Sequence, residues 1–232
     1  MSSGPEVNEQ AEHPDFHRAF SAVRASSGPA REAKHRLVAE VKRLVEAVAM
    51  AGAEASGSDA LDALSTRVAD AATMAESSLS RLPDGLAMAA GEDAALLERS
   101  GFSGRSNPLA PPLQFWTDEY GITHGAATYG PAYEGPPESL HGGYVAAAFD
   151  DLLGFAQMAS GTAGFTGTLT VKMRRRTPLN RRIDYRAEVV RVDGRKIWVT
   201  GTATCDGVLL AEAEILFIKP RDHMPNELPP RA

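Results

Sequence analysis

From residue 113 onward, apolar and polar residues alternate in six short runs, and one long apolar stretch interrupts this alternation after the second run. The first two runs are "LQFWTD" and "THGAATYGPAY", and "GTLTVKMRRR", "IDYRAEVVRV", "KIWVTGTATC" and "VLLAEAEILFIKP" follow the interruption. A period of two predicts β-strands with one buried face. The Asp-Gly pairs at 193–194 and 206–207 favour tight hairpins. An antiparallel meander can bury one inserted helix only by curling around it, which predicts an α+β fold.

The interrupting stretch, "ESLHGGYVAAAFDDLLGFAQMASG" at 138–161, predicts a helix that begins near Gly143. A helical wheel places Asp150 on a stripe of glycine and alanine, where a second chain or a substrate can approach closely. The wheel turns Asp151 about 100° further round, so we expect it to face solvent. The face expected to pack on the sheet holds Val145, Phe149, Leu152, Leu153 and Ala156.

The helix opens on His-Gly-Gly, where unsatisfied backbone N–H groups and the positive end of the helix dipole favour an oxyanion. Gly142 and Asp150 are eight residues apart, which is about 12 Å along one helix. That distance is too long for both residues to serve one carbonyl group. Either one of them takes no part, or the site takes its glycine from one chain and its aspartate from another, which argues for a two-fold dimer.

The first hundred residues have a different character. Residues 1–32 are rich in Ser, Gly, Pro and charge and are expected to lack fixed structure. A helical extension is predicted over 33–100, with a first helix at 33–50 and a second that starts near Ser58 or Asp59 as its N-cap. The main domain is expected at 101–220, followed by a tail at 221–232. We expect the two helices to dock on the main domain or to pack across a dimer. The apolar stripe of the first helix holds Leu37, Val38, Val41, Leu44, Val45 and Val48.

Composition narrows the class of protein. With 232 residues, of which 43% are hydrophobic, one core with an appendage is expected. The net charge of −6 gives no sign of a nucleic-acid partner. One cysteine, Cys205, excludes an internal disulfide framework and fits a reducing compartment. No apolar run approaches the roughly 20 residues of a membrane span, and no secretory leader is seen, so a cytoplasmic protein is expected.

These motifs together resemble the hotdog-fold acyl-CoA thioesterases, in particular the PaaI-like and THEM4-type group. The resemblance covers about residues 105–220. "HGGYVAAAFDDLLG" fits the family pattern of His-Gly-Gly with an Asp nine residues after the His, and Thr166 follows that Asp by sixteen residues. "RRRTPL" and the last three strand runs, with their Gly-Arg-Lys turn, resemble the same family. The implied fold is a long central helix wrapped by a curved antiparallel sheet, here with an N-terminal helical extension.

The resemblance implies roles for single residues. Asp150 would be the general base that activates water or the nucleophile that attacks the thioester, and the sequence does not choose between them. Gly142, with Gly143, would offer backbone N–H groups to the carbonyl oxygen. Thr166 would orient the water or Asp150, and His141 would shape the loop or be only a structural histidine. No metal or cofactor is expected, and the partners would be acyl-CoA and further copies in a homodimer or dimer of dimers.

Coenzyme A is a polyanion, so an acidic protein must bind it with local positive charge. Ten of the 24 Lys and Arg residues lie between Lys172 and Lys196, against three acids. An ordinary solvated sheet edge would show the same pattern. The candidate substrate-binding residues are Arg174, Arg175, Arg176, Arg195, Lys196 and Asn107.

Three other interpretations of these motifs are less well supported. "RSNPLA" imitates a hydratase motif of the same fold, but Arg105 and Ala110 stand where its Asp and His should be. A non-catalytic acyl-CoA sensor predicts a missing helix acid or an attached DNA-binding module, and Asp150 is present. Cys205 has no histidine partner in register and is expected to pack in the core. The acyl length stays open, since the candidate cleft residues Phe149, Phe155, Met158 and Phe165 admit short, aromatic or long groups.

Overall fold

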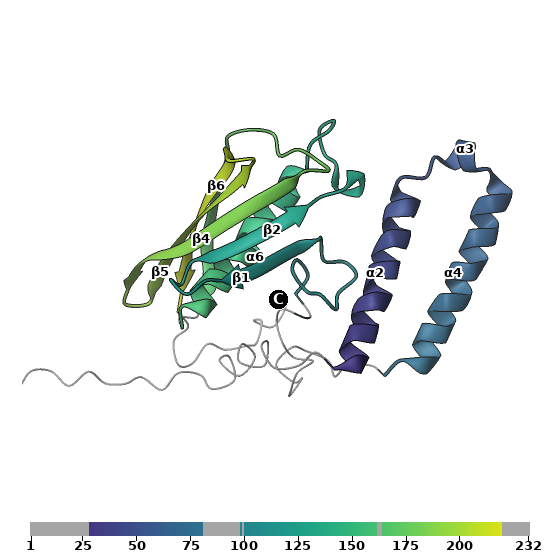
Figure 1. The fold of residues 1–232 in the computed structure, drawn as a ribbon, viewed down its shortest axis with the longest axis horizontal. Coiled ribbons are helices and arrows are strands. Elements are labelled where there is room, and N and C mark those ends of the chain that lie inside the picture. Colours follow the sequence, from purple (N-terminus) through teal and green to yellow (C-terminus); the bar gives the residue numbers. More distant parts are fainter. Residues whose placement is uncertain (1–27, 81–97, 99, 162–163, 220–232) are drawn as a thin grey trace, which may run out of the picture.

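The computed structural model describes residues 28–80, 98, 100–161 and 164–219. In the main domain, six antiparallel strands form one sheet that curves around a single long helix, α6 (Gly142–Ala159), as Figure 1 shows. The predicted α+β architecture is therefore confirmed, and a strand lies in each of the six alternating runs, although the strand in the second run ends at Thr128 rather than at Tyr133. The strands are β1 (Leu113–Thr117), β2 (Thr123–Thr128), β3 (Phe165–Met173), β4 (Arg182–Asp193), β5 (Lys196–Cys205) and β6 (Val208–Ile218).

The strand order in the sheet is β1-β2-β4-β5-β6-β3, so that β1 and β3 are the two edges. The predicted Asp-Gly turns are present. Asp206 and Gly207 have φ values of 48° and 77°, and Gly194 has a φ of 56°. Positive φ at both central residues, as at Asp206 and Gly207, is the geometry of a type I′ hairpin turn. Asp193 instead pairs with Lys196, so Gly194 is the first central residue of its turn and alone has positive φ, as in a type II′ turn. These turns fix the register of β4, β5 and β6, which carry the centre of the sheet.

Helix α6 packs on the sheet through the face predicted from the wheel. Phe149, Leu152 and Leu153 are fully buried, and Val145 and Ala156 are buried beside them. On the sheet, Gly201 in β5 makes room for the helix. A Cβ added at Gly201 would lie 2.7 Å from Leu153 Cδ1 and 3.1 Å from the carbonyl oxygen of Arg186. The absence of a side chain at this position therefore lets α6 lie close against the sheet.

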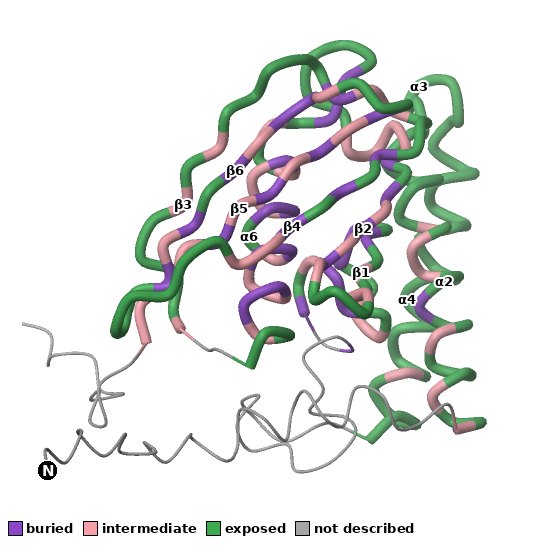
Figure 2. The backbone as a smooth tube through the Cα atoms, turned by 60° about the vertical axis from the view of Figure 1, so that its left-hand side comes forward, coloured by how far each residue is buried: buried purple, intermediate pink, exposed green. Residues whose placement is uncertain are grey.

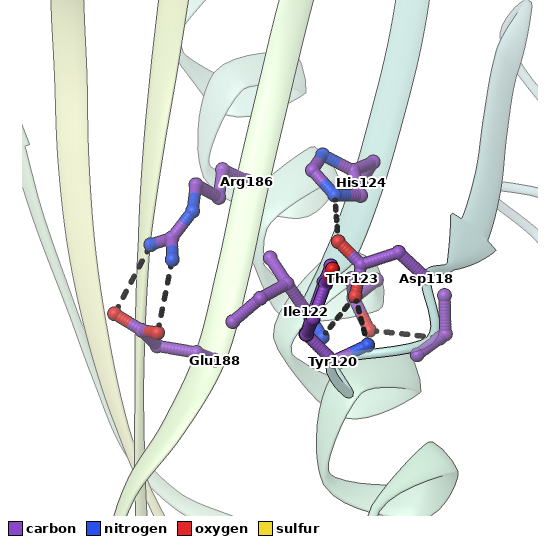
Figure 3. Close-up of polar contacts among 8 residues, drawn as sticks. Asp118, Tyr120, Ile122, Thr123, His124, Arg186 and Glu188 are labelled. Atoms are coloured by element: carbon purple, nitrogen blue, oxygen red, sulfur yellow. Dashed lines mark hydrogen bonds and ion pairs between the residues drawn. The ribbon is translucent and has the colours of Figure 1, made fainter.

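A polar cluster fixes the turn between β1 and β2 on the sheet face turned away from α6 (Figure 3). Asp118 Oδ1 accepts hydrogen bonds from the backbone N–H groups of Tyr120 and Ile122, and Asp118 Oδ2 lies 2.8 Å from His124 Nε2. The hydrogen bond with His124 holds the pKa of Asp118 below its usual range. Arg186 and Glu188 form a two-pronged ion pair on the neighbouring strand. This cluster is a local brace of the hairpin.

The N-terminal extension is an antiparallel helical hairpin of α2 (Pro29–Ala49) and α4 (Ser58–Ser78), joined through the short α3 (Ala53–Ser56). Helix α2 begins four residues before the predicted start, because Pro29 occupies the first helical positions, where it is favoured. The predicted N-cap of the second helix is wrong. Gly57, with a φ of 77°, is the N-cap, and no side chain caps this helix.

One side of α2 contacts the main domain. Val38 is buried in that contact, and a cavity of about 200 Å³ lies there between α2 and the start of β1. Beside it, Glu98 pairs with His35 at 2.7 Å and with Arg31 at 3.8 Å. The docking predicted as one of two alternatives is thus present for α2. Helix α4 lies on the outside (Figure 1).

The two predicted terminal segments lie mostly outside the residues that the structure describes. Most of the segment expected to lack fixed structure, 1–27, lies outside the described residues, as does the predicted tail at 221–232. Among the described helices, none combines the length and the apolar character that crossing a membrane would require.

The close seat of α6 on β5 can be tested by a pair of glycine substitutions. Gly201→Ala forces Leu153 or the sheet to move, and we expect it to lower the free energy of unfolding by about 1–3 kcal/mol. Gly154→Ala, in the middle of α6, meets nothing within 4 Å. It should raise that free energy by up to about 1 kcal/mol, because alanine favours the helix. Urea denaturation measures both values, and equal stability of Gly201→Ala and wild type would contradict this packing.

Candidate active site

The segment before α6 is held in place by a cluster of aromatic side chains and by backbone hydrogen bonds. Tyr133, at the end of the 3-10 helix η4 (Pro131–Tyr133), makes edge-to-face contacts with Tyr129 and Tyr144. Its carbonyl oxygen accepts a hydrogen bond from the N–H of His141 at 3.0 Å, and Leu140 N–H bonds the carbonyl of Thr177. Tyr129 is fully buried, with its hydroxyl 3.0 Å from that of Tyr185, and burial raises the pKa of Tyr129 to about 12. The start of α6 is therefore a fixed position.

The His-Gly-Gly motif forms the first turn of α6. His141 is the N-cap, and its Nδ1 accepts a hydrogen bond of 3.0 Å from the N–H of Gly143. That N–H is engaged, whereas the N–H of Gly142 has no acceptor among the described residues. A Cβ added at Gly142 would lie 3.2 Å from Met173 Cε, at the end of β3. One free backbone donor is thus presented at the helix start, next to the end of the edge strand.

Asp150 lies two turns further along α6 and is exposed. Thr166 Oγ1, at the start of β3, donates a hydrogen bond of 3.2 Å to Asp150 Oδ1. The structure therefore brings together the two residues that the spacing of sixteen singled out. It separates them from Gly142, which lies at the other end of β3.

A β-bulge sets the direction of the Thr166 side chain. Leu169 and Val171 of β3 pair with the inward residues Ile215 and Ala213, so strict alternation would turn residue 166 outward. The register shifts between Thr166 and Thr168, and Thr166 instead pairs with Phe217, which is buried on the inner face. The extra residue is Gly167. The bulge thus turns Thr166 toward α6 and Asp150.

Asp151 was expected to face solvent, and this prediction is wrong. Both of its carboxylate oxygens lie 3.1 Å from Ser100 Oγ, and it is only partly exposed. Burial raises the pKa of Asp151, against the opposing effect of hydrogen bonds from Ser103 and Ser100. The segment around Ser100 folds over this side of α6, and a helical wheel of α6 alone has no means of showing it. Asp151 and the two serines are the site residues that the sequence analysis missed.

A cavity of about 220 Å³ lies beside Asp150 and is bounded by α6, by the start of β3 and by this segment. Asp150, Asp151 and Thr166 stand at its wall with Ser103 and Gln157. Of the four expected cleft residues, Phe149 does not reach it, because Phe149 is fully buried against the sheet. The apolar lining consists of Phe155, Met158, Phe165 and Phe217.

The expected basic residues fall into two groups at opposite ends of β3. Arg174, Arg175 and Arg176 follow Met173, at the Gly142 end. Arg174 forms an ion pair with Glu212, and Arg175 donates a hydrogen bond of 2.8 Å to the carbonyl of Leu209. Part of the hydrogen-bonding capacity of both side chains is therefore used within the chain. Arg176 makes no ion pair among the described residues.

The second basic group is at the Asp150 end. Lys196 pairs in the sheet with Ile218, which also pairs with Phe165 at the start of β3. The neighbouring Arg195 donates from Nε to the carbonyl of Lys219 at 2.9 Å. Within one chain, therefore, no single surface holds both basic groups.

Asn107 is placed in neither group. Its Nδ2 donates to the carbonyl of Ser100, and its Oδ1 accepts from the N–H of Leu109, so its amide braces the segment that covers Asp151. Throughout the described ranges, no three His, Cys, Asp or Glu side chains converge as metal ligands would.

Comparison with solved structures gives a likeness that covers most of the chain. No family model matches the chain. The crystal structure of a thioesterase superfamily protein covers 80% of this chain and 94% of its own, with 27% identity and a TM-score of 0.71. Residues 101–220 make up about half of the chain, so this likeness extends into the helical extension.

Two further relatives match more narrowly. The acyl-coenzyme A thioesterase THEM4 of Xenopus laevis is 33% identical over 92 residues, 39% of this chain and 41% of that protein. The chain thus matches about two fifths of the length of this curated relative. The zebrafish thioesterase superfamily member 2 aligns over 54% of this chain and 91% of its own, with 18% identity and a TM-score of 0.47. The sheet wrapped around α6 confirms the predicted hotdog fold, and over four fifths of its length the chain is similar to a protein of the thioesterase superfamily.

Proposed function

We propose that this protein hydrolyses acyl-CoA thioesters to the free acid and CoA at a site shared by two copies of the chain. The observation that carries the proposal is the placement of two chemical groups at the two ends of β3. Asp150, bonded to Thr166, stands at one end, and the free N–H of Gly142 stands at the other. A carboxylate that takes a proton from water and a donor that stabilises an oxyanion are the two groups that this thioester hydrolysis uses.

Two-fold pairing of β3 would complete the site. This strand is an edge of the sheet, and Phe165 and Met173 at its ends are 61% and 53% exposed. Exposed edge strands readily pair with a further strand. If β3 pairs antiparallel with β3 of a second copy about its middle, the start of each strand faces the end of the other. Asp150 of one chain then lies near Gly142 of its partner, which removes the separation of about 12 Å along one helix.

The same pairing would gather the positive charge. Arg174, Arg175 and Arg176 of one copy would meet the end of the partner that carries Lys196. Because Arg174 and Arg175 also bond the protein itself, we assign the leading role toward the CoA phosphates to Arg176 and Lys196. The cavity beside Asp150, with its three phenylalanines, would take the acyl group. The single, buried Cys205 fits the cytoplasmic location that we propose for this enzyme.

In the reaction, Asp150 removes a proton from water, which attacks the thioester carbonyl carbon, or Asp150 attacks that carbon itself. In either case the carbonyl oxygen becomes an oxyanion that the Gly142 N–H stabilises, and the C–S bond then breaks to release CoA as a thiolate, which takes up the proton that water has lost to Asp150 or, in the nucleophilic route, a proton from solvent. In the nucleophilic route water then hydrolyses the Asp150–acyl anhydride and frees the acid. Thr166 holds the Asp150 carboxylate in position. A single turnover in ¹⁸O-labelled water distinguishes the routes. Water activated by Asp150 places the label in the released acid, whereas hydrolysis of an Asp150–acyl anhydride at the aspartyl carbon places it in Asp150 and leaves the first released acid unlabelled.

The role of the Asp150 carboxylate can be tested by substitution. Asp150→Asn should lower the rate of acyl-CoA hydrolysis by about 10² to 10⁴, the range for a positioned acid or base. The measurement is free-thiol release from a panel of acyl-CoAs, acetyl to palmitoyl with phenylacetyl and benzoyl. The preferred acyl group of the wild type names the substrate class.

Asp151→Asn is the informative companion, since it makes the same chemical change one position along α6. A large loss in Asp151→Asn with full activity in Asp150→Asn would contradict our assignment of the acid. A wild type that binds acyl-CoA but hydrolyses none of the panel would instead favour a non-catalytic acyl-CoA sensor.

The role of the Gly142 N–H as a hydrogen-bond donor can be tested in the same way. Gly142→Pro removes the N–H and adds a small ring, which the backbone accepts because proline suits the first helical position and His141 before it is already extended. We expect a loss of about 10² to 10³ in kcat. Gly142→Ala is the matched control, since it adds the same Cβ beside Met173 and keeps the N–H. Equal activity of the proline and alanine variants would remove Gly142 from the mechanism.

A mixing experiment tests the shared site. Asp150→Asn and Gly142→Pro chains are each inactive alone in the proposal, but a mixed dimer carries one intact site. After unfolding and refolding a 1:1 mixture, we expect about a quarter of wild-type activity, because half of the randomly formed dimers are mixed. No recovery above the two separate variants would show that Asp150 and Gly142 serve within one chain or not at all.

A further inference from the structure

The helical hairpin of the extension leaves a long apolar seam uncovered. Leu37, Val41, Leu44 and Val48 recur along α2 at alternating spacings of four and three residues, and Leu61, Leu64, Val68, Ala71 and Ala75 do so along α4. This repeat is the signature of helices that pack in bundles with interlocking side chains. No residue of α4 is buried, and Figure 2 shows this helix exposed along nearly its whole length. Ala75 is its one partly buried residue.

The two helices do not cover each other's seam. Leu61, Leu64 and Val68 are 36%, 41% and 39% exposed, and Leu37 and Val48 are about half exposed. Val41 and Leu44, between the last two, are partly buried. Only the other side of α2, around Val38, is used to dock on the main domain. The hairpin is therefore held beside the domain by α2, with its seam open.

We propose that the occupant of this seam is the same hairpin of a second copy of the chain, so that two hairpins form a four-helix bundle. Matching length supports this occupant, because α2 and α4 each have 21 residues, or three heptads. Two such helices side by side present a face of about 31 Å by 20 Å. That area approaches the roughly 800 Å² per partner of a stable interface.

Charge also favours a second copy. Helix α2 has five Lys and Arg residues against three Glu, whereas α4 has one Arg against four acids. In a two-fold bundle with α2 of one chain beside α4 of the other, each positive helix has only negative neighbours. The bundle would join chains independently of the β3 edge, so that dimers made through β3 become dimers of dimers.

The first test measures the molar mass of the full chain by light scattering over a range of concentrations. The double variant Leu64→Asp with Val68→Asp places two charges in the seam, and it should have half the mass of the wild type. Thr66→Asp with Thr73→Asp adds the same charges to the opposite side of α4 and should keep the wild-type mass. Acyl-CoA hydrolysis per chain should be equal in all three, so a failure of the proposed enzyme activity leaves the mass result intact.

A second test does not depend on disrupting the hairpin. In a Cys205→Ser background, Ala75→Cys places one thiol in the seam of α4 and Thr73→Cys places one on its outer side. A short bifunctional maleimide should join two chains through residue 75 and leave the residue 73 variant single. Unchanged mass in the seam variant together with no cross-link at residue 75 would overturn the proposal, and residues 81–97 or another protein would then be the occupant.

Discussion

The seat of α6 on the sheet is the contact on which the rest of the domain depends. Phe149, Leu152 and Leu153 lose all contact with water there, and burial of such side chains contributes about 1.5–3 kcal/mol each. Gly201 lets the helix approach, and this fixes both the depth and the rotation of α6. Rotation matters because it is what turns Asp150 outward, beside the small residues, and presents the first turn of the helix to the end of β3. This packing positions the backbone of the site, and the hydrogen bond from Thr166 then orients the Asp150 carboxylate.

Much of this arrangement follows from local pattern. Strand alternation, the Asp-Gly turns and the apolar face of α6 were all readable, because each depends on neighbours within about four residues. Asp151 was misplaced for the opposite reason. Its hydrogen-bond partner is Ser100, 51 residues earlier in the chain. A helical wheel shows only the residues of one helix, so it does not predict a contact with a distant segment that folds over that helix. Phe149 was assigned both to the core and to the cleft, and only packing against β5 decides between them.

The basic residues show a second limit of sequence reasoning. Their clustering in the chain suggested one phosphate site, yet the structure separates them to the two ends of an edge strand and commits Arg174 to Glu212. The meander folds back on itself, so closeness along the chain does not ensure closeness in space. The two groups converge only if a second copy is added. The N-terminal helices likewise had a readable amphipathic pattern, but the pattern alone did not say which part of the stripe meets the domain and which part stays open.

The bulge at Gly167 also affects how relatives of this chain should be compared. Thr166 faces Asp150 because one extra residue interrupts the strand, so the distance between these residues in the chain carries as much information as their identity. A related chain with one residue fewer at this point would retain the same aspartate and threonine in an alignment, yet present the hydroxyl to the opposite face of its sheet. Counting residues across this strand is therefore a stricter criterion for transferring function than matching letters.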